Sequence, residues 1–222
     1  MDILMPIHKP YTDRIFDGTK IMEFRTRIGK DIHCGDTIYV YETKNNSGSG
    51  SVIGSVKIKN IISIPKVKVG TYFLLPYYVE QYGTEEEKET VKRAMKIKFD
   101  GYNSSLVLSY LFQADALSYI EANMVPPSPW PLYGSSLKEY NEAKCKEDDL
   151  LTRCDKWGKK IGFYNAYDES DWKIAILLEN PVLFKIPRKI EEFRGRNGNN
   201  LTRAPQSWCY LQRMEVSDES AN

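Results

Sequence analysis

The sequence predicts an α+β protein in which a β-barrel carries a helical insertion between its strands. Segments rich in β-branched and aromatic residues gather near both ends of the chain. The middle, over about 66–170, has helical character instead. We therefore expect a single domain over 1–213 that encloses this insertion, and a disordered tail over 214–222.

The first elements follow from local patterns. Residues 2–7 have strand character, and Pro10 suits the first turn of a helix that Gly18 would end. Residues 21–27 alternate between apolar and charged side chains, which predicts another strand. Alternation places Met22 and Phe24 in the core.

The next segment predicts two strands joined by a loop. Residues 37–43 are rich in β-branched and aromatic side chains, and 44–50 are typical of a turn or flexible loop. A long strand follows over 52–64, in which Gly54 indicates a bend or a bulge.

The helical middle begins with an N-terminal capping box formed by Thr84 and Glu87. Val91, Met95 and Phe99 follow at four-residue spacing, which predicts a helix with one buried stripe.

Further helical segments are expected on either side of a loop. Residues 104–123 are apolar nearly all round and predict a buried helix. Residues 125–134 form a proline-rich loop, and 136–157 predict one helix or two short ones.

Strand character returns over 172–186, where Asn180 and Pro181 predict a break. A short helical turn over 187–193 and an open basic loop over 194–200 follow. The last predicted strand spans 206–212.

Composition limits the possible functions. The 222 residues carry a net charge of +1, so attraction of a polyanion requires a local basic patch. We find no apolar stretch of about 18 residues and no signal-peptide pattern, and we expect a cytoplasmic protein without a membrane partner. The four cysteines form no C-x-x-C pair, so we predict reduced thiols, no metal and no cofactor.

The N-terminal motif resembles a known family. His8 to Tyr11 read H-x-P-Y, and Gly18 to Arg25 read G-x-K-x-x-E-x-R. These residues resemble the opening motif of ASCH domains (activating-signal-cointegrator homology), which belong to the PUA-like superfamily. The segments GDTIYVYET, VIGSVKIKNI, AILLENPVLFKIPRKIEEF and APQSWCYL resemble later parts of the same family.

This resemblance implies a PUA-like (ASCH) β-barrel with a cleft for a nucleic acid or a nucleotide. Some ASCH proteins are reported as RNA-binding or as nucleases. Some small bacterial members are amidohydrolases that act on N4-acetylcytidine with a lysine, a threonine three residues later and a distant glutamate. Lys20 matches that lysine, but Glu23 stands at the threonine position, which is a departure from the amidohydrolase pattern.

The central candidate site consists of Lys20, Glu23 and Arg25. Glu23 and Arg25 share one face of the predicted strand, and Lys20 lies just before it. Arg25 could hold a phosphate or a base edge, Glu23 could accept a proton or position Arg25, and Lys20 could contact a phosphate. A desolvated Lys20 could instead act as a base. The alternative is an exposed ion pair of little energetic value.

Each of the further ligand-binding candidates has a structural alternative. His8 and Lys9, at the entry to the first helix, could bind an anion or make ordinary loop contacts. Tyr41, on one strand face with Tyr39, could stack on a base or belong to the barrel core. A basic segment followed by an aromatic residue could bind single-stranded nucleic acid or be a solvated loop; its candidate residues are Arg194, Arg196 and Trp208.

Three functions remain open on this evidence. The first is binding of RNA, single-stranded nucleic acid, a nucleotide or a nucleoside. The second is hydrolysis of a modified nucleoside such as N4-acetylcytidine, or of RNA, with Lys20 and Glu23 as catalytic residues. The third is a scaffold whose helical insertion binds a protein partner, with the loop over 125–134 either docking that partner or packing as a connector.

Overall fold

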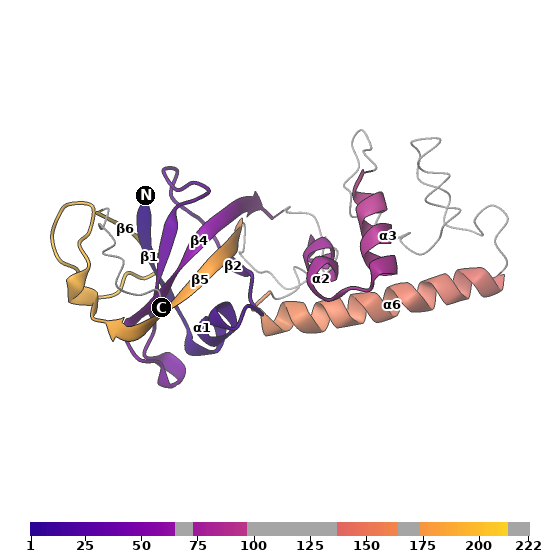
Figure 1. The fold of residues 1–222 in the computed structure, drawn as a ribbon, viewed down its shortest axis with the longest axis horizontal. Coiled ribbons are helices and arrows are strands. Elements are labelled where there is room, and N and C mark those ends of the chain that lie inside the picture. Colours follow the sequence, from indigo (N-terminus) through magenta and orange to yellow (C-terminus); the bar gives the residue numbers. More distant parts are fainter. Residues whose placement is uncertain (65–72, 97–136, 164–173, 213–222) are drawn as a thin grey trace. The chain divides into compact units, whose positions relative to one another are not determined.

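The structure is a computed structural model that describes residues 1–64, 73–96, 137–163 and 174–212 (Figure 1). The chain divides into two compact units. The first contains Met1–Ile64 with Asp171–Asn222, and the second contains Pro65–Ser170. The second unit spans the segment expected as an insertion, and the organisation as one domain stays a prediction.

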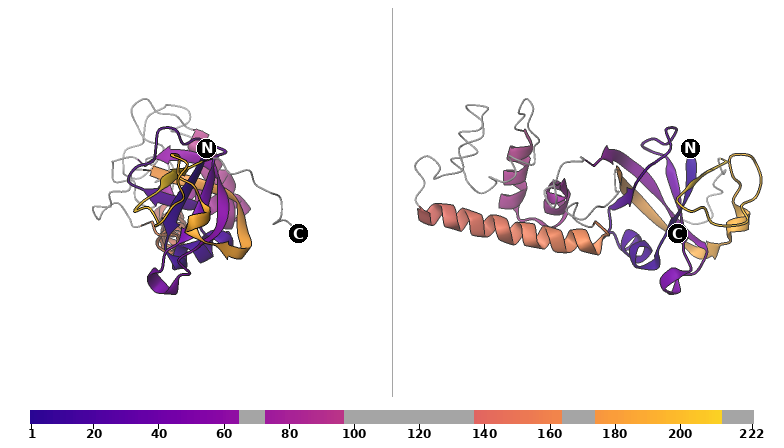
Figure 2. Two further views of the ribbon diagram at one scale, coloured as in Figure 1. Left: turned by 90° about the vertical axis from the view of Figure 1, so that its left-hand side faces the viewer. Right: turned by 180° about the vertical axis from the view of Figure 1, so that it is seen from behind.

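The first unit is built on a curled sheet of six strands in the order β2-β5-β4-β3-β1-β6 (Figures 1 and 2). Strands β1 and β3 are parallel, and the other neighbouring pairs are antiparallel. With helix α1 and the helices of the second unit, the protein is of the α+β class. The strands are β1 Asp2–Ile7, β2 Met22–Arg25, β3 Thr37–Glu42, β4 Val52–Ser63, β5 Ile174–Arg188 and β6 Cys209–Leu211.

Helix α1, Lys9–Phe16, follows β1 as expected, with Pro10 in its first turn. The chain then turns at Gly18, whose φ of +79° favours glycine. Strand β2 is shorter than the predicted 21–27, and β6 is shorter than the predicted 206–212. The loop over 44–50 contains a short 3₁₀ turn, Asn45–Ser47.

The long strand β5 corrects one prediction, because it does not break at Asn180 and Pro181. It stays continuous from Ile174 to Arg188, and its register against β4 shifts between Ser55 and Lys57. Asn180 takes a positive φ of 49° at this irregularity. The proline is tolerated because a bulge leaves a position without a ladder hydrogen bond. The bulge predicted at Gly54 is confirmed by register shifts on both sides of β4.

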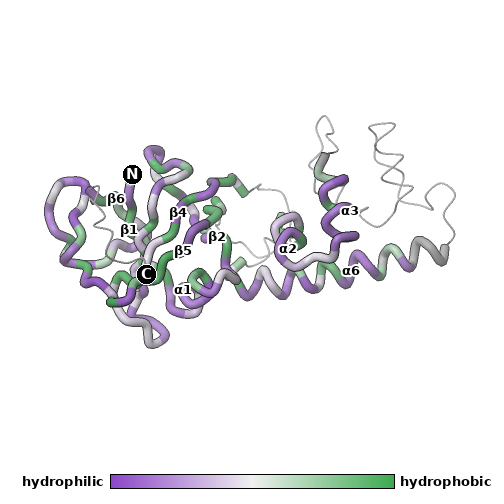
Figure 3. Tube along the Cα trace, in the orientation of Figure 1, coloured by the Kyte–Doolittle hydropathy of each residue, from purple (hydrophilic) through white to green (hydrophobic). Residues whose placement is uncertain are grey.

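The sheet buries side chains on both faces. Ile3, Met5 and Ile7 of β1 belong to one apolar cluster, which Tyr11 and Phe16 of α1 also contact. Leu4, between them in sequence, belongs to a second cluster. Figure 3 shows the hydrophobic residues concentrated along the strands. This alternation is the direct result of the two-residue period of a strand.

The second unit contains α2 Leu75–Tyr82, α3 Glu85–Lys96 and α6 Leu137–Lys160. Helix α2 is absent from the sequence prediction, and α6 is one continuous helix. The capping box at the start of α3 is confirmed: the Thr84 N–H donates to Glu87 at 2.8 Å, and the Glu87 N–H donates to the Thr84 hydroxyl at 3.2 Å.

The predicted apolar stripe of α3 is only partly correct. Val91 is buried, but Met95 is 44% exposed. Ala94 is buried in its place, so the packed face turns by one residue. Phe99 lies outside the described residues.

Trp157 is 6% exposed and packs against the rings of Tyr78 and Tyr82. This burial favours packing over partner binding at that tryptophan. The helix expected over 104–123, the loop over 125–134 and the tail over 214–222 lie outside the described residues. Among the helices of the described ranges, none is long and apolar enough to cross a membrane.

Candidate functional site

Lys20, Glu23 and Arg25 converge in a three-residue cluster of charges. The Glu23 carboxylate lies 3.3 Å from the Lys20 Nζ through Oε2 and 2.9 Å from an Arg25 guanidinium nitrogen through Oε1. One carboxylate therefore contacts two cations, which leaves one excess positive charge among these three side chains. We call these residues the charge cluster.

The backbone fixes each member of the charge cluster. The Lys20 N–H donates to the Arg14 carbonyl at 2.7 Å, which ties the end of the turn back to α1. On β2, Glu23 lies opposite Ile176 and Arg25 lies opposite Ile174. Directly opposed residues of an antiparallel pair share a face, so both charged side chains lie on the face of the first apolar cluster.

The charge cluster is shielded from solvent. The exposed fractions of its side chains are 2% for Lys20, 11% for Glu23 and 13% for Arg25. The alternative of an exposed ion pair is therefore wrong. Alternation correctly predicts Met22 and Phe24 as core residues, but the opposite face is packed as well. Glu23 and Arg25 are the two members of the charge cluster that remain partly exposed to solvent.

Aromatic rings surround the ammonium group of Lys20. Its Nζ lies 5.2 Å from the centre of the Tyr11 ring and 5.1 Å from that of Phe24, within cation–π distance. Burial lowers the pKa of Lys20, and the Glu23 carboxylate opposes this effect only in part. The lowered pKa moves Lys20 toward the range in which an amine can accept a proton.

The guanidinium group of Arg25 has one nitrogen with a backbone hydrogen bond and one buried nitrogen without a partner among the described residues. A terminal guanidinium nitrogen donates to the Pro6 carbonyl at 2.8 Å. Its Nε is buried and has no hydrogen-bond partner among the residues that the structure describes. A buried donor without an acceptor costs about 1–3 kcal/mol. Such a donor is uncommon in folded proteins. The Arg25 side chain as a whole keeps 13% exposure, which leaves part of it open to a ligand.

His8 and Lys9 lie in a second polar cluster, where β1 ends and α1 begins. The His8 Nδ1 is 2.8 Å from the Thr43 hydroxyl. Lys9 pairs with Asp13 at 3.1 Å and lies 3.7 Å from the buried Glu42. These are the local contacts of the structural alternative, and binding of an anion there stays a prediction.

Glu42 is a buried acid that sequence patterns do not reveal. Its carboxylate accepts hydrogen bonds from the Thr12 hydroxyl at 2.8 Å and the Ser49 N–H at 2.6 Å. Burial raises the pKa of Glu42, but these bonds and the Lys9 charge outweigh it, so the pKa lies below its ordinary value. The 44–50 loop folds back so that the Ser49 N–H reaches this carboxylate. We therefore infer that Glu42 has a structural role in holding the loop.

The tyrosine pair on β3 belongs to the core. Tyr39 and Tyr41 are both buried, in the second apolar cluster. Tyr39 packs edge-on against Phe193, with ring centres 5.2 Å apart. The stacking role expected of Tyr41 is therefore wrong in this structure, since a base needs an exposed ring face.

The C-terminal candidate residues make contacts that do not involve the charge cluster. Arg196 forms an ion pair with Asp31 at 3.1 Å and lies over the Tyr210 ring at 5.3 Å. Trp208 is half-buried and packs edge-on against Tyr210. Arg194 is exposed. Within the described ranges, no group of three or more potential ligands is placed to hold a metal ion.

Part of the chain matches a model of a known protein family. A model of the ASCH domain matches residues 5–104, a range that contains the charge cluster. A crystal structure of an ASCH protein from Zymomonas mobilis aligns with a TM-score of 0.38 and 14% identity, covering 96% of this chain and 88% of that one. Two mutants of that protein align with TM-scores of 0.39 at the same identity, covering 91% and 89% of those chains. No curated protein sequence gives a significant match.

Proposed function

We propose that this chain, of which residues 5–104 match a model of the ASCH domain, binds RNA, or a nucleotide within RNA, at the charge cluster. The observation that carries the proposal is the pairing of two buried cations with one carboxylate. The excess positive charge suits a phosphate or an electron-rich base edge. Low solvent exposure strengthens such an interaction because it is screened less than one in water.

The three side chains have different roles in this proposal. Arg25 is the most exposed of the three side chains, so it is the proposed contact to a ligand oxygen. Glu23 orients Arg25 and can accept a hydrogen bond from an amino group of a base. Lys20 is too buried to reach a backbone phosphate directly, and it contributes charge and holds Glu23 in place.

Fluorescence anisotropy with labelled single-stranded RNA tests this proposal. Arg25→Ala should weaken binding by about ten-fold or more, the expected loss for one charge-assisted hydrogen bond. Arg27→Ala is the matched control, since Arg27 is the same residue type two positions later and is exposed. Circular dichroism would establish that both variants keep the fold.

Equal affinity of Arg25→Ala and the unmodified protein would contradict the proposed site. Equal losses in Arg25→Ala and Arg27→Ala would indicate diffuse charge attraction rather than a defined site. Absence of binding to every RNA and single-stranded DNA tested would contradict nucleic-acid binding itself.

Hydrolysis at the same cluster is a second candidate, and the lowered pKa of Lys20 favours it. An amine of lowered pKa beside a carboxylate can serve as a base, with Glu23, the more exposed of the two, carrying the proton between substrate and Lys20. Incubation with N4-acetylcytidine and with labelled RNA tests for turnover. Activity that survives both Lys20→Met and Glu23→Gln would exclude this cluster as the catalytic site.

A further inference from the structure

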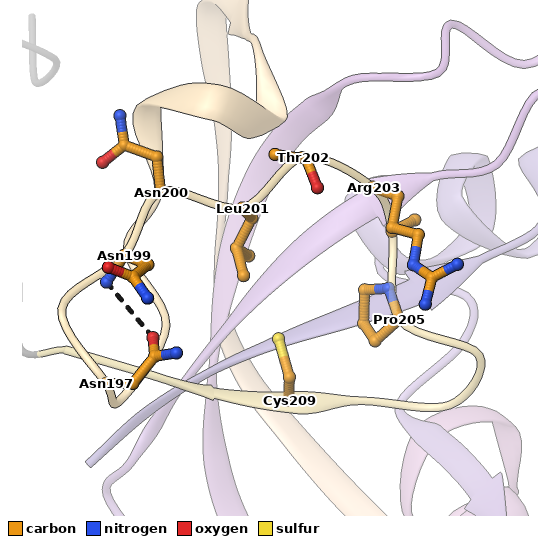
Figure 4. A pocket seen from close by; sticks show the side chains of 9 residues that line it. Asn197, Asn199, Asn200, Leu201, Thr202, Arg203, Pro205 and Cys209 are labelled. Atoms are coloured by element: carbon orange, nitrogen blue, oxygen red, sulfur yellow. Dashed lines mark hydrogen bonds between the residues drawn. The ribbon is translucent and has the colours of Figure 1, made fainter.

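The loop that precedes β6 lines an open pocket of about 260 Å³ (Figure 4). Its apolar wall includes Leu201, Pro205 and Cys209, and its polar wall is dominated by asparagines of the 197–200 segment. Figure 4 shows Leu201 and the Cys209 thiol directed into the space between the two arms of the loop. The volume is below the roughly 300–1,000 Å³ of pockets for drug-sized ligands, and it suits one flat ring.

The loop is held in shape by its own hydrogen bonds. The Gly195 N–H donates to the Asn199 carbonyl at 2.9 Å, and the Leu201 N–H donates to the Phe193 carbonyl at 2.8 Å. The Asn197 side chain accepts from the Asn199 N–H at 3.1 Å. Binding therefore requires little ordering of the backbone, and preorganisation of this kind favours affinity.

The polar wall offers paired donors and acceptors. A carboxamide presents one oxygen acceptor and two N–H donors on the same end group. The side-chain amide of Asn199 has no hydrogen-bond partner among the residues that the structure describes, so it is available to a ligand. The Asn200 side chain is directed away from Leu201 and Cys209 (Figure 4). The pocket wall contains no carboxylate.

We propose that this pocket binds the adenine ring, either as a base turned out of single-stranded RNA or in a free adenine nucleotide. Adenine presents an acceptor at N7 beside a donor at N6, and a carboxamide matches this pair with two hydrogen bonds. Leu201 and Pro205 would contact the faces of the ring. Splayed bases of single strands are the usual target of sequence-specific RNA recognition.

Arg203 supplies the charge for the attached phosphate. It lines the pocket and is exposed, and within the described ranges it forms no ion pair. Arg196, by comparison, is already paired with Asp31. Arg203 is therefore the phosphate contact of the adenine site. This inference rests on the proposed binding of RNA or a nucleotide and adds a second contact point that specifies the base.

Base selectivity provides the first test. The protein should bind oligo(A) about ten-fold or more tighter than oligo(C) or oligo(U), as one bidentate contact provides. The double variant Asn199→Ala with Asn200→Ala should lose this preference and keep the affinity for oligo(C). Asn45→Ala, at an exposed asparagine of another loop, is the matched control and should keep the preference.

Alkylation of Cys209 provides a second test that does not require RNA. Replacement of the exposed Cys34 and Cys145 by serine leaves Cys209 as the accessible thiol, because Cys154 is buried. Adenosine monophosphate should slow its modification by a maleimide about five-fold or more at saturation, since the ring would cover the thiol. Cytidine monophosphate should have a much smaller effect.

The outcomes separate the two proposals. Equal binding of all three homopolymers, unchanged in the double variant, would overturn the adenine pocket while RNA binding stands. Protection of Cys209 by adenosine monophosphate without binding to any oligonucleotide would support the pocket as a nucleotide site and contradict RNA binding. Stronger protection by guanosine monophosphate would overturn the assignment to adenine.

Discussion

At the residue scale, Glu23 is the member of the charge cluster on which the other two depend. It contacts both Lys20 and Arg25, whereas each cation keeps other interactions in the fold. Removing one partner of a buried ion pair costs about 3–5 kcal/mol, because the remaining charge is left uncompensated. The three side chains are therefore not equivalent for stability.

Glu23→Ala should lower the free energy of unfolding by about 3–5 kcal/mol. Lys20→Met should cost clearly less, because it removes the buried charge and leaves Glu23 paired with Arg25. Urea unfolding followed by circular dichroism measures both changes. Equal losses in the two variants would show that Glu23 does not have this central position.

Glu42 should produce a measurable pH dependence. Its pKa in the folded chain is below the ordinary 4.5, so the folded state favours the carboxylate more than the unfolded state does. This contribution to the free energy of unfolding is complete above the unfolded pKa, and it is lost as pH falls through the lower folded value. Stability should therefore decline below a pH of about 4.5.

Glu42→Gln should flatten this acid limb, since glutamine has no proton to gain. Unfolding free energies measured between about pH 6 and pH 2.5 compare the variant with the unmodified protein. Glu191→Gln, at an exposed glutamate, is the control. An acid limb that Glu42→Gln leaves unchanged would contradict the assignment.

At the element scale, the capping box of α3 should have a measurable energetic value. Thr84→Ala removes the hydroxyl that accepts the Glu87 N–H, and it should cost about 0.5–2 kcal/mol. Thr90→Ala is the control, because the Thr90 hydroxyl donates to the Glu86 carbonyl in the preceding turn of the same helix and does not cap the helix. Loss of helix signal at a lower temperature in Thr84→Ala alone is the expected result. Identical melting of the two variants would contradict it.

Strand β4 offers a second element to test, at Gly54. A Cβ added there would lie 2.4 Å from the Val182 carbonyl of β5 and 2.5 Å from the Phe16 ring of α1. Gly54→Ala should therefore destabilise the first unit by about 1–3 kcal/mol through overpacking. Ser55→Ala, at the next residue, should have little effect. Thermal unfolding of both variants measures these effects. A Gly54→Ala variant with unchanged stability would contradict the close approach of α1 to this position.

Features of helices and strands that depend on neighbouring residues in the sequence were predicted correctly. The capping box, the alternation in β2 and the bulge at Gly54 depend on neighbours in the sequence, and these predictions are confirmed. The break at Asn180 was wrong because pairing with β4 on both sides of the bulge keeps β5 continuous. The face of α3 was wrong at Met95 because packing between helices, which no local period reveals, selects Ala94.

The candidate site was predictable to the same extent. Motif and spacing identified Lys20, Glu23 and Arg25, and the structure brings them together. Their burial was not predictable, because it depends on α1 and β5 packing on the face that strand alternation left open. The role of Glu42 and the pocket before β6 depend on loop returns that the sequence does not specify.

At the scale of the whole molecule, the net charge of +1 limits how RNA can be attracted. A protein without a strong overall field gains affinity from a small number of local contacts. For single strands, the logarithm of the affinity falls with the logarithm of the salt concentration, with a slope of about −0.7 per phosphate contact. The charge cluster and Arg203 together imply a few such contacts.

We therefore expect a shallow salt dependence, with a slope of about −0.7 to −2. Anisotropy titrations at several salt concentrations measure it, and Arg25→Ala should reduce the slope while Arg27→Ala should not. A slope of zero would exclude phosphate contacts. A much steeper slope would indicate a broad basic surface in place of the two local sites.

The most direct test of the central claim observes Arg25 itself while RNA is added. NMR resolves the Nε–H signals of arginine side chains, and the Arg25 signal can be assigned by comparison with Arg25→Lys. The Nε of Arg25 is buried without a partner among the described residues, and it belongs to the same guanidinium group as the nitrogens proposed to contact RNA, so its signal should shift in proportion to bound RNA. The Arg27 signal should stay in place. Saturation of the protein with RNA while the Arg25 signal remains unchanged would contradict binding at the charge cluster.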